Sequence, residues 1–236
     1  MRSFIATYLD LPRVRLALLA ALFTSYFGSL WLGALHFPHT YDWRRNAISN
    51  LLSPRDNPHG YGLPCAGVAM AGVFMLALAA WIEGELGDAG TKLARRVRRP
   101  AFLAGIGCLS LAAVIVPQHI HTQLGTRHLH EILARTSAGG LGIGMLAACV
   151  TAATDAQNRK LRALRVLWRV IAVPPVAAGV VSGLVVALAG LGGIPAEAAA
   201  YFRGTVFWHL AFWEWVGSAV VFLFFAAPVL MLGKSE

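Results

Sequence analysis

Eight histidines are the residues of this chain best suited to acid–base or metal chemistry. They fall in two stretches, from His36 to His59 and from His119 to His130, and once more at His209. Neutral imidazole binds zinc, copper and haem iron, and it exchanges protons near neutral pH. The loops that are rich in Lys and Arg contain no histidine. This asymmetry predicts a polar site on one face of the protein.

A metal site is one use of these histidines. In His119-x-His121 the two side chains reach one ion only from extended backbone, since residues i and i+2 point about 200° apart on a helix. Zinc needs three or four ligands that converge. We predict His119, His121, His130 and His209 as the metal ligands, with zinc as the first candidate. Copper, or haem held by His209 with His130 or His36, is the alternative. Otherwise, the histidines hydrogen-bond loops and lipid phosphates at the membrane interface.

Charged residues inside apolar segments add to the predicted site. Glu131 and Arg135 are four residues apart, which suits an intrahelical ion pair, and Glu214 is expected at about mid-membrane in the last apolar segment. Ionisable groups at membrane depth need a partner and are often functional. One interpretation is a structural Glu131–Arg135–Glu214 cluster. The other gives His130, Glu131 and His209 catalytic acid–base roles, with Arg135 and Glu214 contacting substrate.

The stretch from His36 to Gly62 is the third source of candidates. Asp42 is suited to cap a helix that begins at Trp43 and ends before Pro54. One face of that helix is apolar, which predicts a short interfacial helix. The alternative is a lid that turns Ser49 and Asn50 into a lipid-facing pocket. Ser49 is then a candidate catalytic group, with Asn50 and Arg45 contacting substrate.

These residues are positioned by long apolar segments. The chain has 236 residues, of which 57% are hydrophobic and 13% charged, whereas soluble domains have about 25% charged residues. A membrane helix needs about 20 apolar residues. We therefore predict one all-α integral membrane domain over 1–236, a bundle of six transmembrane helices with a short outer interfacial amphipathic helix. The expected spans are 14–35, 62–82, 101–117, 128–153, 166–191 and 202–232.

Small residues recur at four-residue spacing in three of these spans. The rows are Ser25–Ser29–Gly33, Gly140–Gly144 and Gly179–Gly183. Such rows let helices approach closely in lipid. They predict tight contacts within the bundle.

The distribution of positive charge predicts the topology. The chain has 20 Lys and Arg residues against 11 Asp and Glu, a net charge of +9. Most of the positive residues fall at the N-terminus, between the second and third spans, and between the fourth and fifth. The positive-inside rule places those loops and both termini in the cytoplasm of a multi-pass cell-membrane protein. The basic charge therefore needs no nucleic-acid partner, and the histidines lie on the non-cytoplasmic side.

Short motifs resemble a known family. Ile48-Ser49-Asn50-Leu51 resembles the Ile-Ser-Asp/Asn-Leu signature of a six-helix membrane family, which includes damage-regulated autophagy modulators, the FGF-receptor-activating protein, GPI-lipid remodelling proteins and bacterial proteins of unknown function. The stretch from Gly125 to His130 resembles that family's Gly-Thr…His segment. The resemblance implies that the protein acts on or binds membrane lipids, and Asn50 stands where many members have Asp. The pieces from Arg45 to Asn50 and Trp208-His209 are faintly similar to alkaline ceramidase-type membrane hydrolases, which have seven helices.

Three functions are compatible with this pattern. The first is a lipid-modifying enzyme, such as a metal-assisted hydrolase or an acyl-transfer enzyme. The second is a non-catalytic lipid-binding or transport-regulating protein that uses the same pocket. The third is an accessory subunit of a larger membrane complex, with protein partners and with haem, copper or nothing at its histidines.

Overall fold

The computed structural model describes residues 8–9, 11–87, 89–115, 129–154 and 159–232, without the side chains of 131, 154, 159 and 160. Within these residues the chain is all-helical, and six helical segments are long and apolar enough to cross a membrane. The predicted fold class is confirmed. Long apolar segments form helices in lipid because a helix satisfies its backbone hydrogen bonds within the segment itself.

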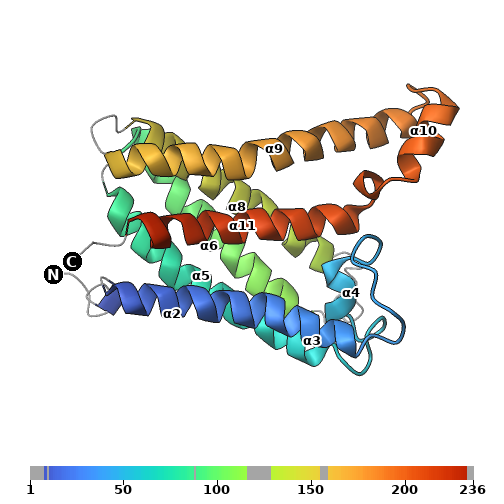
Figure 1. Cartoon of the computed structure of the whole chain (residues 1–236), viewed down its shortest axis with the longest axis horizontal. Coiled ribbons are helices and arrows are strands. Elements are labelled where there is room, and N and C mark those ends of the chain that lie inside the picture. Colours follow the sequence, from blue (N-terminus) through green and yellow to red (C-terminus); the bar gives the residue numbers. More distant parts are fainter. Residues whose placement is uncertain (1–7, 10, 88, 116–128, 155–158, 233–236) are drawn as a thin grey trace.

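The six segments run alternately up and down the bundle (Figure 1). The first comprises α2 (Pro12–Phe23), the π-helix η1 (Thr24–Gly28) and α3 (Ser29–Leu35). The others are α5 (Gly62–Leu86), α6 (Lys92–Ile115), α8 (Leu129–Thr154), α9 (Arg159–Gly190) and α11 (Leu210–Met231). Short helices α4 (Ile48–Leu52), α10 (Ala196–Arg203) and η3 (Val206–Trp208) lie at one end, here the α4 end. The opposite end, where α6 and α9 begin, is here the basic end.

Close helix contacts explain two of the three small-residue rows. A Cβ at Gly67 of α5 would lie 2.0 Å from the Ser29 hydroxyl oxygen, and one at Gly140 of α8 would lie 2.7 Å from the backbone nitrogen of Gly105 in α6. These helices therefore touch through backbone, as the spacing predicts. The third row is different, since a Cβ at Gly183 of α9 would meet nothing within 4 Å.

The core is centred on α5, and α9 lies at the edge of the bundle. In the most apolar part of α5 56% of the residues are buried, whereas in that of α9 only 6% are. Phe222, Phe224 and Phe225 of α11 are buried with Phe102 of α6 in the same core cluster. Trp168 attaches α9 to this core by stacking on Phe224, with ring centroids 4.3 Å apart.

Four helix starts differ by five residues or more from the expected ones. α6 begins at Lys92 rather than 101 and α9 at Arg159 rather than 166, because basic residues that precede the apolar run are already helical. The interfacial helix does not begin at Trp43, because residues 43–45 form a turn and α4 starts only at Ile48. The sixth span does not begin at 202, because α10 ends at Arg203 and α11 starts at Leu210. In these last two segments apolar residues lie outside the helix, so a run of apolar residues does not by itself mark where the helix begins.

Candidate functional site at the α4 end

The site is assembled where the segment 36–61 folds over the ends of α3, α5 and α11 (Figure 1). The start of α4 is fixed by its own third residue. The backbone N–H of Ala47 donates to Oδ1 of Asn50 at 2.8 Å. The Tyr41 hydroxyl donates to the carbonyl oxygens of Asn46, at 2.8 Å, and of Ala47, at 3.1 Å. These hydrogen bonds satisfy backbone N–H and C=O groups that have no partner within a helix. They also connect the turn to the start of α4.

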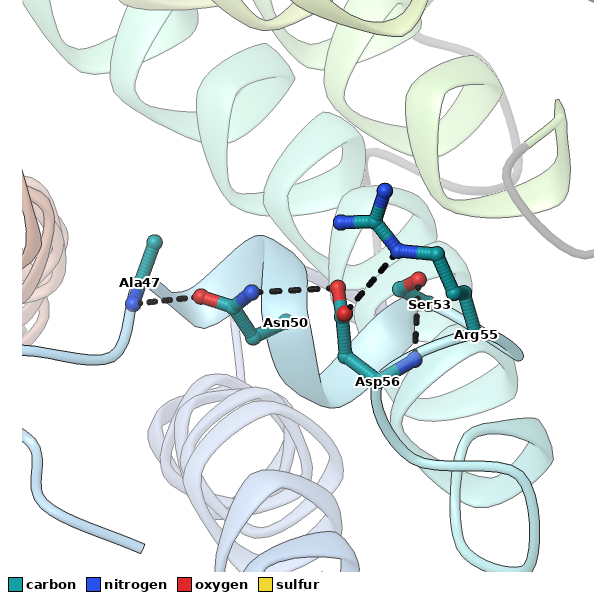
Figure 2. Close-up of polar contacts among 5 residues, drawn as sticks. All are labelled: Ala47, Asn50, Ser53, Arg55 and Asp56. Carbon is teal, nitrogen blue, oxygen red and sulfur yellow. Dashed lines mark hydrogen bonds and ion pairs between the residues drawn. The ribbon is translucent and has the colours of Figure 1, made fainter.

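Asn50 also connects α4 to the acidic side chain that follows it (Figure 2). Its Nδ2 donates to Oδ2 of Asp56 at 3.1 Å, and the Arg55 Nε donates to Oδ1 of Asp56 at 3.1 Å. Partial burial raises the pKa of the Asp56 carboxyl, but hydrogen bonds from Arg55, Asn50 and Ser53 more than offset it. The pKa of Asp56 therefore lies below its ordinary value, and Asp56 is a carboxylate at neutral pH. The amide oxygen and the amide nitrogen of Asn50 are thus both used in hydrogen bonds within this segment.

Glu214 links the same segment to α11. Its Oε2 accepts a hydrogen bond from the backbone N–H of Ile48 at 2.7 Å, at the first residue of α4. A carboxylate at a helix start satisfies N–H groups that have no partner within the helix. The expected partner of Glu214 was Arg135, and no ion pair joins the two side chains, both of which are described. Because α11 begins at Leu210, Glu214 lies in the second turn rather than at mid-membrane.

A second polar contact lies one turn further into the bundle. The hydroxyl groups of Tyr26 and Ser218 are 2.7 Å apart, and Ser218 is four residues after Glu214 on α11. Tyr26 belongs to η1, a π-helical turn of the kind that often occurs at functional sites. Asn50 and Glu214 thus accept from two successive backbone N–H groups at the start of α4, and the Tyr26–Ser218 contact lies one turn further along α11.

The histidines do not assemble within the described residues. His36, His39 and His59 are exposed, and the Nδ1 of His36 lies 2.8 Å from the carbonyl oxygen of Leu32. His209 falls inside the span expected over 202–232, but it is the residue before α11 and is half-buried. His130 lies in the first turn of α8, also half-buried, whereas His119, His121 and His128 lie outside the described residues. No group of three His, Cys, Asp or Glu residues suited to a metal was found among those described.

The remaining predicted site residues are spread over this end of the molecule. Glu131 lies in α8 with its side chain outside the described part, and Arg135 is exposed on the same helix. Arg45 is exposed, with its Nε 3.9 Å from the nearer Asp42 oxygen. Ser49 is half-buried on α4. The catalytic and substrate roles assigned to these residues stay predictions.

Sequence reasoning missed an aromatic cluster at the same end of the bundle. The rings of Trp43 and Phe212 have centroids 6.3 Å apart, and those of Phe207 and Phe212 5.4 Å. Two guanidinium groups lie over aromatic rings at the same end, Arg44 at 5.5 Å from the Trp43 ring and Arg203 at 5.8 Å from that of Trp208. The available signal was Trp and Arg within five residues of one another near a span end, because aromatic belts mark membrane interfaces.

The buried amide of Asn57 was also missed. Its side chain is fully buried, and its Nδ2 donates to the carbonyl oxygens of Gly33 at 3.1 Å and Leu51 at 3.2 Å. Asn57 therefore joins the end of α3 to α4. The Asn-Pro pair at 57–58 was a turn signal, but it gave no indication of this connection.

Comparison with known proteins identifies no relative. No protein-family model, curated protein or solved structure matches the chain. Of the resemblance to the six-helix family, the structure therefore supports only the architecture, an apolar bundle with six helices long enough to span a membrane.

Proposed function

We propose that this polytopic membrane protein binds membrane lipids and holds an anionic lipid headgroup at its α4 end. The observation that carries the proposal is the pair of arginine–aromatic contacts, Arg44 over Trp43 and Arg203 over Trp208. A guanidinium group pairs with phosphate through two parallel hydrogen bonds. Exposed aromatic rings favour the headgroup level of a bilayer. All four residues are at least partly exposed.

Binding is favoured over catalysis by what the polar side chains already do. Asn50 caps α4 and holds Asp56, while Glu214 accepts the N–H of Ile48. A catalytic acid or base must reach the proton that it transfers. Side chains committed to backbone and to one another are instead typical of a rigid frame for a binding surface. In this proposal the basic end faces the cytoplasm and the α4 end faces the other side of the membrane.

Native mass spectrometry of the full chain in nanodiscs tests this proposal. The nanodiscs contain phosphatidylglycerol and phosphatidylcholine, and the retained lipids are counted after release. We expect retention of phosphatidylglycerol by the wild type and loss of that retention in Arg44→Gln/Arg203→Gln. The control is Arg55→Gln, because the Arg55 side chain is 85% exposed and contacts Asp56 rather than an aromatic ring.

Equal retention in all three proteins would count against headgroup binding at this end. Elemental analysis of the same preparation, made without a histidine tag, separates the enzymatic alternative. Zinc near one equivalent per chain would favour the metal-assisted hydrolase predicted from His119, His121, His130 and His209.

A further inference from the structure

A buried arginine that has no acidic partner among the described residues lies at the basic end, far from the α4 end. Arg15, in the first turns of α2, is 2% exposed. Its Nε and Nη2 are buried, and neither has a hydrogen-bond acceptor in the described part of the chain. The guanidinium carbon lies 4.6 Å from the centroid of the Trp81 ring of α5. The Trp81 Nε1 is also buried and without an acceptor there.

An arginine in this position has to remain charged. Its side chain is not deprotonated in proteins, so it cannot respond to burial by losing its proton as lysine or histidine does. The face of an indole ring attracts a cation, but it accepts no conventional hydrogen bond from Nε and Nη2. A buried charge persists only where something pairs with it. An anion beside Arg15 and Trp81 would supply both the opposite charge and the missing hydrogen-bond acceptor.

The nearest acid along α5 is not available to Arg15. Glu83 receives two hydrogen bonds from Arg98, from Nε at 2.5 Å and from Nη2 at 2.9 Å. Within the described residues Arg15 takes part in no ion pair. In the described part of the chain, the unpaired polar atoms of Arg15 and Trp81 are all donors, Nε and Nη2 of Arg15 and the indole N–H of Trp81. Such a set selects an oxyanion over a cation.

We propose that Arg15 and Trp81 form a second anion-binding position, which takes a phosphate group at the basic end. It is separate from the headgroup position proposed at the α4 end. The phosphate group belongs either to a lipid of the leaflet at this end or to free inorganic phosphate. Arg15 supplies the charge and two N–H groups, and Trp81 supplies a third donor together with the ring under the guanidinium group.

The test is a thermal unfolding titration of the full chain in mild neutral detergent. Inorganic phosphate is one probe, with chloride salt at equal ionic strength as reference, and phosphatidylglycerol in mixed micelles is the other. We expect one of the two probes to raise the midpoint of unfolding of the wild type. Arg15→Met should weaken the apparent affinity about tenfold or more, the range for hydrogen bonds to a charged group. Arg13→Met is the matched control, because Arg13 is exposed two residues earlier.

Trp81→Phe gives a second measurement if Arg15→Met fails to fold, because it retains a ring and removes only the N–H. We expect it to weaken binding about threefold, as for one neutral hydrogen bond. A response to phosphatidylglycerol alone assigns the site to a lipid, and a response to phosphate assigns it to the free ion. The proposal is overturned if neither probe stabilises the wild type, if Arg15→Met and Arg13→Met respond equally, or if Trp81→Phe binds as the wild type does.

Discussion

The buried ion pair between Arg98 and Glu83 gives the sharpest test of how the basic end is held together. Arg98 is 2% exposed, and the Glu83 side chain is 21% exposed. The guanidinium group makes two hydrogen bonds with the carboxylate, and its third nitrogen donates to the Thr151 hydroxyl at 3.0 Å. One cluster thus connects α5, α6 and α8. Glu83→Ala would leave the Arg98 charge buried with only a hydroxyl as partner.

Loss of one partner of a buried pair costs about 3–5 kcal/mol. Because Glu83 is partly exposed, water can reach the vacated position, so we expect about 3 kcal/mol for Glu83→Ala, the low end of that range. Arg98→Met in the same chain removes the stranded charge. The double variant should therefore be less destabilised than Glu83→Ala alone, by about 1–3 kcal/mol, a coupling typical of residues in contact.

Reversible unfolding in mixed micelles, with the dodecyl sulfate fraction as denaturant and far-UV circular dichroism as signal, measures these free energies of unfolding. Glu85→Ala is the control, since Glu85 is exposed two residues along α5 and surface changes stay within about 0.5 kcal/mol. The reasoning fails if Glu83→Ala behaves like Glu85→Ala. It also fails if the double variant is as unstable as the sum of the single ones.

Three further predictions concern helix contacts and the α4 end. Gly67→Ala should prevent normal folding or lower the free energy of unfolding by at least about 1–3 kcal/mol, the range for overpacking, because its Cβ would lie 2.0 Å from the Ser29 hydroxyl oxygen. Gly107→Ala is the control and should be tolerated, since a Cβ there would meet nothing within 4 Å. The midpoints of thermal unfolding of the two variants test this. The lowered pKa of Asp56 means that its carboxylate stabilises the fold above the ordinary Asp pKa of about 3.9, and that this stability is lost as the pH falls through the folded value. An unfolding series at falling pH should show that loss in the wild type and not in Asp56→Asn. Glu214→Leu should speed hydrogen exchange in α4 by about fivefold, since a lost cap costs about 1 kcal/mol, and Glu214→Gln, which keeps an acceptor oxygen, should not.

Much of the fold follows from the sequence because it depends on local properties. A run of about 20 apolar residues is sufficient for a membrane helix, whatever its neighbours are. The close approaches at Ser29 and Gly140 could likewise be predicted, because a small residue is the condition for backbone contact; that Gly67 faces Ser29 was not predicted. The candidate site could be predicted only in part. Its location near Asn50 was expected, but a sequence does not give the hydrogen-bond partners of that side chain.

The tertiary structure decided which polar groups meet. Glu214 could have faced Arg135, and it accepts the N–H of Ile48 instead, because helix rotation and the path of segment 36–61 bring that amide to α11. Arg15 reads as one more positive-inside charge, yet it lies buried against Trp81. Hydropathy fixes which residues enter the membrane, because burying apolar surface is non-directional. Polar contacts are directional and short, so they depend on where each helix is placed and how it is turned.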